Sequence, residues 1–222
     1  MIVQASCHGT DNAAMLDCIA SDPKRYRGVA IVDDSFSDAD YDRLDAVGVC
    51  GVRFNFVKHL GGAPAMGVFN RVIGRIKGRG WHVVLHLDAP GIVPLSPMIR
   101  ALSLPFVIDH MGRVPSAAGV DQPGLRALIE LSRLKNCWIK VCGAERISMP
   151  PYAAAMTIAR TLVEATPTRV LWATDFPHPN ATHEADEADE ADLVDLVPQF
   201  AASPLAQRRL LVDNPARLYG FD

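Results

Sequence analysis

A histidine and an arginine lie three residues apart in the segment IDHMGR, residues 108–113, at the end of an expected strand. A neutral imidazole such as that of His110 can polarise a carbonyl group or bind a metal ion, and the guanidinium of Arg113 can hold a carboxylate through two hydrogen bonds. A single histidine in a turn can also be purely structural. Its place beside an arginine at a strand end favours a role in a ligand pocket.

A second candidate group is the segment TDFPHPN, residues 174–180. Asp175 ends the last expected strand, and two prolines then stiffen the loop that carries His178 and Asn180. Asp175 can act as a general base toward water beside a polarised carbonyl, or it can bind a divalent metal ion. The alternative is an aspartate that caps a following turn or helix.

Three arginines fall in three different strand-end units: Arg53 in GVRFNFVKHL, Arg113 in IDHMGR and Arg146 in KVCGAERIS. Several cationic side chains facing one pocket imply an anionic ligand, and three of them suit a di- or tricarboxylate. Each signal is weak by itself, and a surface ion pair is the alternative for Arg146.

Seven short apolar runs alternate with longer stretches of helical pattern. The runs cover residues 2–6, 29–33, 51–56, 82–88, 106–110, 137–141 and 170–175, and the helical stretches cover residues 10–20, 38–47, 69–77, 124–134 and 152–164. Nearly continuous apolar strands are typical of a parallel sheet covered by helices. Because no glycine-rich nucleotide motif follows any strand, a (β/α) barrel is favoured over a doubly wound sheet. The polar strand ends then form its catalytic face.

The expected fold is therefore α/β, a TIM-barrel-like (β/α)8 domain that spans residues 1–222. Seven strands are counted, and the first begins next to Met1, which predicts a barrel without its first strand and helix. An unpaired strand edge is prone to association, so a homo-oligomer would be one way to cover it.

The composition, 49% hydrophobic and 21% charged over 222 residues, is that of an ordinary globular domain. The net charge of −3 and the scattered arrangement of 22 lysines and arginines argue against nucleic acid and anionic membranes as partners. No apolar run approaches the roughly 20 residues of a membrane span, and no secretion signal is seen. Five cysteines without a C-x-x-C pair fit a reducing compartment, so we expect a cytoplasmic protein that binds a small molecule.

The segment EADEADEADLVD, residues 184–195, repeats a three-residue unit and holds seven acids in twelve positions. Such a run is typical of a solvated loop or the start of a helix.

Seven motifs together resemble one family along essentially the whole chain. In order they are QASCHGTDN, GVRFNFVKHL, VLHLD, IDHMGR, WIKVCGAERIS, TDFPHPN and NPARLYGF. This order is similar to that of the 2-pyrone-4,6-dicarboxylate lactonase branch of the amidohydrolase-related family. IDHMGR and TDFPHPN are specific to that branch, whereas NPARLYGF marks the wider amidohydrolase group.

The resemblance implies a distorted (β/α)8 barrel of amidohydrolase type. It implies hydrolysis of 2-pyrone-4,6-dicarboxylate to 4-oxalomesaconate during the degradation of aromatic compounds, without a metal or other cofactor. By this likeness Asp175 activates water and His110 polarises the lactone carbonyl. The residues expected to bind the substrate are Ser6, Arg53, His59, His86, Arg113, Arg146 and Asn180.

Two departures from the family pattern leave alternatives open. The family's first strand ends in a His-x-His pair, and this chain has none; His59 and His86 also stand where close relatives of the type member carry arginine and tyrosine. Related enzymes act on sugar lactones, on sulfomuconolactone or, with zinc, on decarboxylation substrates. The alternatives are therefore another lactone, a metal-dependent hydrolase or decarboxylase with His86, His110 and Asp175 as ligands, and an incomplete barrel that only binds anions.

Overall fold

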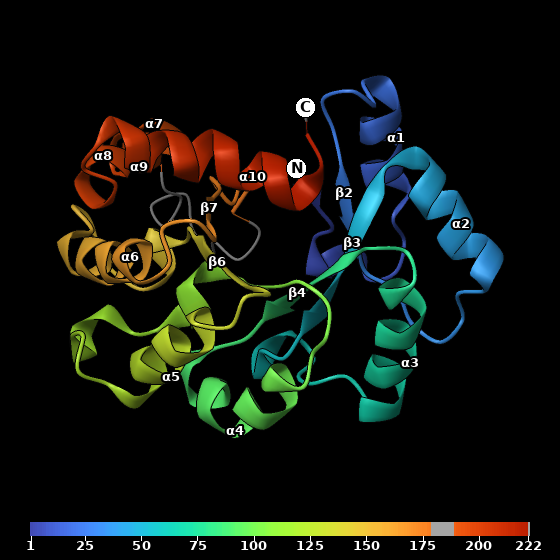
Figure 1. The fold of residues 1–222 in the computed structure, drawn as a ribbon, viewed down its shortest axis with the longest axis horizontal. Helices are drawn as coiled ribbons and strands as arrows, with labels where there is room; N and C mark the ends of the chain where they lie inside the picture. The colour runs from blue at the N-terminus through green and yellow to red at the C-terminus, as the bar shows by residue number, and fades with distance from the viewer. Residues whose placement is uncertain (179–188, 222) are drawn as a thin grey trace. The chain divides into compact units, whose positions relative to one another are not determined.

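The computed structural model describes residues 1–178 and 189–221, apart from the side chain of His59. Seven strands alternate with helices along this part of the chain (Figure 1). The described residues form two compact units. One comprises Met1–His86 and Leu102–Val107 with Phe221, and the other comprises Leu87–Ala101 and Ile108–Gly220. The expectation of one domain over residues 1–222 stays a prediction.

The first unit is built on four parallel strands that pair in chain order. Its elements are β1 (Ile2–Val3), α1 (Ala13–Ser21), β2 (Gly28–Ala30), α2 (Asp38–Val47), β3 (Val49–Asn55), α3 (Met66–Lys77) and β4 (His82–His86). Val29, Val52 and Val83 are fully buried on neighbouring strands. Gly51 is required in β3, because a Cβ atom there would lie 2.5 Å from the imidazole of His82.

The second unit holds two parallel strands and most of the helices. Its elements are α4 (Ala89–Arg100), α5 (Pro123–Ser132), β6 (Cys137–Val141), α6 (Ala153–Ala165), β7 (Val170–Trp172), α7 (Glu190–Asp195), α8 (Val197–Phe200), α9 (Pro204–Arg208) and α10 (Asn214–Tyr219). The first two residues of β5 (Phe106–Ile108) belong to the first unit, and its last residue, Ile108, begins the segment Ile108–Gly220 of the second unit. All five residues of β6 are buried, as expected for a strand covered on both faces.

All seven expected strands are confirmed, but several are shorter than the apolar runs that predicted them. β5 ends at Ile108 and β7 ends at Trp172, so that His110 and Asp175 lie in the connections that follow. Both residues have positive φ angles, 48° and 67°, which cannot continue a strand. The polar residues at the ends of these apolar runs therefore lie just after the strands, in the connections that carry the candidate site.

The five expected helices are confirmed as α1, α2, α3, α5 and α6. Helix α4 was not expected, because its sequence APGIVPLSPMIR contains three prolines and prolines disfavour helix interiors. Burial of Ile92 and Ile99 provides the packing that sequence propensity lacks. Among the described helices, none is long and apolar enough to cross a membrane.

The acidic segment contributes the start of a helix where it is described. Asp189 accepts a hydrogen bond from the backbone N–H of Ala191, and α7 then begins at Glu190. An acidic first turn is favourable there because the helix dipole is positive at that end. Residues 184–188 of the segment lie outside the described residues.

One buried amide connects α10 to the start of β7. The side chain of Asn214 is 2% exposed, and its Nδ2 donates to the carbonyl oxygens of Pro167 and Val170 at 3.2 and 2.8 Å. We expect Asn214→Ala to lower the free energy of unfolding by about 1–3 kcal/mol, because both carbonyl groups lose this donor. Urea denaturation measures the change. The exposed Asn70 of α3 is the matched control, and equal effects of Asn70→Ala and Asn214→Ala would contradict this role.

Candidate active site

The connection after β5 turns sharply and buries an imidazole. His110, Met111 and Arg113 have φ angles of 48°, 51° and 46°. Such left-handed conformations are costly for residues with side chains and are typical of functional sites. Gly112, with φ 62°, must be glycine because a Cβ atom would come within 2.8 Å of the Ile92 side chain. The His110 residue is only 4% exposed.

The connection after β7 brings a carboxylate beside that imidazole. Asp175 Oδ1 lies 3.8 Å from His110 Nε2. Arg146, which follows β6, donates from Nε to Asp175 Oδ2 at 2.6 Å, and its Nη2 approaches the same oxygen. Burial raises the pKa of Asp175, the negative charge of Asp109 adds to this, and the Arg146 guanidinium opposes it. The carboxyl group is therefore a stronger base than an exposed aspartate.

A buried ion pair lies against the same nitrogen of the imidazole. Lys140 Nζ lies 2.8 Å from Asp109 Oδ1, and Asp109 Oδ2 lies 3.5 Å from His110 Nε2. Burial alone would lower the pKa of Lys140, but the adjacent Asp109 carboxylate outweighs burial and raises it above its usual value. Lys140 therefore stays charged and balances the charge of Asp109.

A second carboxylate lies on the other side of Arg146. Glu145 Oε1 is 3.6 Å from Arg146 Nε and 3.6 Å from His178 Nδ1. Burial raises the pKa of Glu145, and the nearby charge of Asp175 adds to this. The other nitrogen of His178 lies 3.3 Å from Glu190 Oε1 of α7. The loop that carries Asp175 is thus connected to α7 through His178.

Arg113 is a half-buried cation whose surroundings include a second guanidinium. Burial lowers its pKa, and the positive charge of Arg146 lowers it further, while Asp88 and Asp175 oppose these effects. Two guanidinium groups close enough to interact create a positive potential that suits an anionic ligand.

In the first unit the structure brings together two of the predicted substrate-binding residues. Arg53 is 8% exposed and donates from Nη1 to Ser6 Oγ at 3.2 Å. His86 is buried at the end of β4, where its carbonyl oxygen accepts from the backbone N–H of Phe56. His59 follows β3, and its side chain lies outside the description, so that its predicted contact with substrate stays a prediction.

The second unit unites four of the predicted residues, namely His110, Arg113, Arg146 and Asp175. Asn180 lies outside the described residues. Asp109, Cys142 and Glu145 stand within the quoted motifs but were not among the predicted site residues. Position at a strand end was the available signal, and it could not reveal which side chains face one another.

Two groups of potential metal ligands occur among the described residues. They are Asp109, His110 and Cys142, and Glu145, Asp175 and His178. In each group a cation of the chain already neutralises an aspartate, Lys140 in the first and Arg146 in the second. A divalent ion would have to displace a buried ion pair, so these donor sets do not suit a resident metal and no reaction step is assigned to one.

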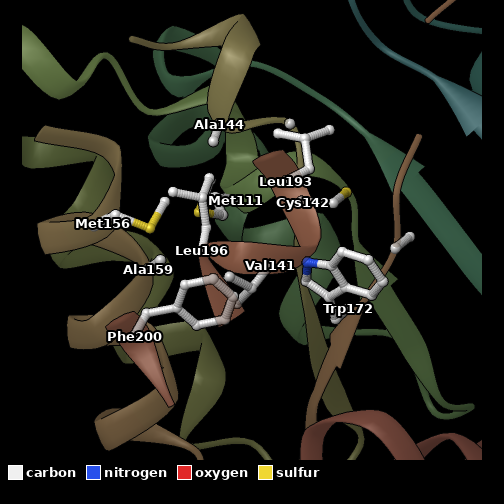
Figure 2. Close-up of a pocket in the computed structure, with 12 residues that line it drawn as sticks. Met111, Val141, Cys142, Ala144, Met156, Ala159, Trp172, Leu193, Leu196 and Phe200 are labelled. Atoms are coloured by element: carbon white, nitrogen blue, oxygen red, sulfur yellow. The ribbon is translucent and has the colours of Figure 1, made fainter. Parts of the chain in front are cut away.

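A small apolar pocket lies beside this cluster (Figure 2). Its lining residues come from the β5–α5 connection, β6, α6, β7, α7 and α8, and include Met111, Cys142, Met156, Trp172, Leu196 and Phe200. Such a lining does not suit a carboxylated ligand. The pocket instead places apolar side chains around Cys142.

The Lys140–Asp109 pair makes a testable contribution to stability. We expect Lys140→Met to lower the free energy of unfolding by about 3–5 kcal/mol at neutral pH, because Asp109 is left as a buried, uncompensated charge. The loss should shrink in acid, where Asp109 can take up a proton. Denaturant titrations at two pH values measure this. Lys135→Met, at an exposed position, is the control, and equal losses in the two variants would contradict the assignment.

Comparison with known proteins gives a consistent family assignment. The family model described as Amidohydrolase matches residues 1–221. A 2-pyrone-4,6-dicarboxylate hydrolase from Comamonas testosteroni is 41% identical over 231 residues, which cover 99% of this chain and 75% of that protein. A 4-sulfomuconolactone hydrolase from Hydrogenophaga intermedia is 37% identical over 221 residues, covering 98% and 73%.

A solved structure extends the likeness to the fold. It is a probable 2-pyrone-4,6-dicarboxylic acid hydrolase from Acinetobacter baumannii with citric acid bound, with a TM-score of 0.87 and 29% identity. The match covers 99% of this chain and 83% of that one. The predicted TIM-barrel-like fold and the predicted lactonase resemblance are both confirmed. The chain belongs to the amidohydrolase family.

Proposed function

We propose that this protein hydrolyses the ester bond of a carboxylated lactone, and that its substrate is 2-pyrone-4,6-dicarboxylate, which it opens to 4-oxalomesaconate. The observation that carries the proposal is the Asp175 carboxylate, held by Arg146 and lying 3.8 Å from His110. A base, a polarising imidazole and a guanidinium in one buried cluster are what ester hydrolysis by water requires. The named activity of the Comamonas relative supports this substrate.

In the proposed reaction Asp175 accepts a proton from water as the water oxygen bonds to the lactone carbonyl carbon. His110 and Arg146 donate hydrogen bonds to the carbonyl oxygen as it gains negative charge. The tetrahedral intermediate then collapses and the ring C–O bond breaks. The proton on Asp175 passes to the departing ring oxygen, which leaves as the enol of the open acid. Water is consumed, and the side chain returns to its starting state.

Cationic residues would hold the carboxylates of the substrate. The positive charge of Arg146 lowers the pKa of Arg113, and an anion between the two guanidinium groups would relieve that repulsion. Ser6 and Arg53 form a second, hydrogen-bonded group in the first unit. We assign His59, His86 and Asn180 to substrate binding as well, on the family resemblance alone. Citric acid in the Acinetobacter structure is consistent with a preference for polycarboxylates.

A second candidate substrate is a sulfonated lactone. Two relatives, 37% and 35% identical, are named 4-sulfomuconolactone hydrolases. Sulfonate and carboxylate groups both bind guanidinium through oxygen, so the arginine set alone does not separate these substrates. Relative kcat/KM values for the two lactones decide between them.

We also propose a cytoplasmic setting, with a small anionic lactone as the partner. All five cysteines are free, which fits a reducing compartment. A homo-oligomer remains a prediction, and size-exclusion chromatography with light scattering measures it.

Replacement of the proposed base tests the role of Asp175. We expect Asp175→Asn to lower kcat on 2-pyrone-4,6-dicarboxylate by roughly 10²–10⁴-fold, because the amide cannot accept a proton from water. The loss of pyrone absorbance measures the rate, and circular dichroism checks the fold. Asp121→Asn, at an exposed surface position, is the matched control. Near-normal turnover by Asp175→Asn would remove Asp175 from this role.

The same assignment predicts the direction of the pH dependence. Only ionised Asp175 can act as the base, and burial raises its pKa, so kcat/KM should fall in acid at a higher pH than an ordinary aspartate would cause. Arg146→Gln should move this acid limb to still higher pH, since Arg146 lowers the pKa of Asp175. Initial rates between about pH 4 and pH 9 provide the test, because this range covers both ordinary and raised carboxyl pKa values. A flat profile would exclude a carboxylate base.

A further inference from the structure

We propose that Cys142 is a positioning residue for the hydrolysis: its thiol holds His110 in the tautomer that carries its proton on Nε2. This inference rests on the proposed function, in which His110 donates a hydrogen bond to the lactone carbonyl. No step of the reaction above uses Cys142.

The contacts of the His110 ring distinguish its two nitrogens. Cys142 Sγ lies 3.2 Å from Nδ1, and both side chains are buried. Nε2 lies on the opposite side, 3.5 Å from Asp109 Oδ2 and 3.8 Å from Asp175 Oδ1. Ionised carboxylates only accept hydrogen bonds, so the nitrogen that faces two of them is the one that should carry the proton. In the neutral ring, Nδ1 is then an acceptor and needs a donor.

Cys142 is suited to be that donor because its thiol keeps its proton. Burial raises the pKa of Cys142 well above 9, and the negative charge of Asp109 adds to this, while Lys140 opposes it. Figure 2 shows Cys142 among apolar side chains that include Met111, Val141 and Trp172. A neutral S–H group facing a ring nitrogen donates to it.

The backbone after β6 permits this close approach. Gly143 follows Cys142 with φ 75°, in the left-handed region. A Cβ atom at this position would lie 3.2 Å from His110 Nδ1 and 3.1 Å from the Arg146 side chain. Glycine therefore leaves room for the imidazole to contact the thiol and for the Arg146 side chain to lie beside them.

The tautomer matters for the rate because the carbonyl oxygen becomes negative during the reaction. A proton on Nε2 stabilises that oxygen, whereas a lone pair on Nε2 would repel both the oxygen and the carboxylates of Asp109 and Asp175. The contribution of Cys142 should therefore appear in kcat rather than in KM, since the charge develops only after the substrate binds.

The experiment compares three variants by kinetics and by nitrogen-15 NMR of ring-labelled histidine, with His110→Gln used to assign the His110 signals. In the wild-type chain we expect Nδ1 to give the signal of an unprotonated, hydrogen-bonded nitrogen and Nε2 that of a protonated one. Cys142→Ala should lower kcat by about 10- to 100-fold with little change in KM, and should populate the second tautomer. Cys142→Ser should restore the tautomer and bring kcat to within a few-fold of wild type, because a hydroxyl group also donates.

Cys137→Ala is the matched control, because it removes another buried thiol, from β6, whose Sγ lies 3.9 Å from the Trp138 carbonyl oxygen. It should leave kcat and the His110 signals unchanged. A protonated Nδ1 in the wild-type chain would overturn the proposal, and so would an unchanged tautomer and kcat in Cys142→Ala. The NMR signals do not depend on turnover. A Cys142-dependent tautomer in a chain that hydrolyses no lactone would therefore refute the proposed function while retaining the hydrogen bond.

Discussion

Buried charge is the constraint on which the candidate site depends. Asp109, Lys140, Arg146 and Asp175 all lie in the second unit with side chains no more than 16% exposed. An ionised group in such surroundings is stable only against an opposite charge, and the structure supplies one for each: Lys140 for Asp109, and Arg146 for Asp175. The backbone is strained at His110 and Asp175, in the connections that follow β5 and β7, where the imidazole and the carboxylate come together.

The two ion pairs differ in a way that suits two different tasks. The side chains of Lys140 and Asp109 are both nearly inaccessible to solvent, which suits an ion pair that holds His110 in a fixed position. Asp175 is more exposed and shares its guanidinium with Glu145, so that its charge is less completely balanced. A carboxylate held in this way keeps a raised pKa and a position near the imidazole. This difference fits the proposed function, in which the Lys140–Asp109 pair fixes His110 and Asp175 transfers the proton.

Strand order and the residues that form the candidate site could be predicted from the sequence because they depend on local pattern. Apolar runs located all seven strands, and the polar residues at their ends located His110, Arg146 and Asp175. Helix α4 was missed because its prolines hide a helix that burial stabilises. The contact of Cys142 with His110 and that of Glu145 with Arg146 could not be predicted, since the local sequence around a residue does not reveal its partner at another strand end.

The most direct test of the account is hydrolysis of 2-pyrone-4,6-dicarboxylate by this chain in water enriched in oxygen-18, with a chelator present. If Asp175 directs water to the lactone carbonyl, the pyrone absorbance disappears and one heavy oxygen enters the carboxylate formed from that carbonyl. Recovery of intact pyrone after saturable binding would contradict the account and identify an anion-binding protein. Turnover that stops with chelator and returns with a divalent ion would contradict the assignment of the chemistry to side chains.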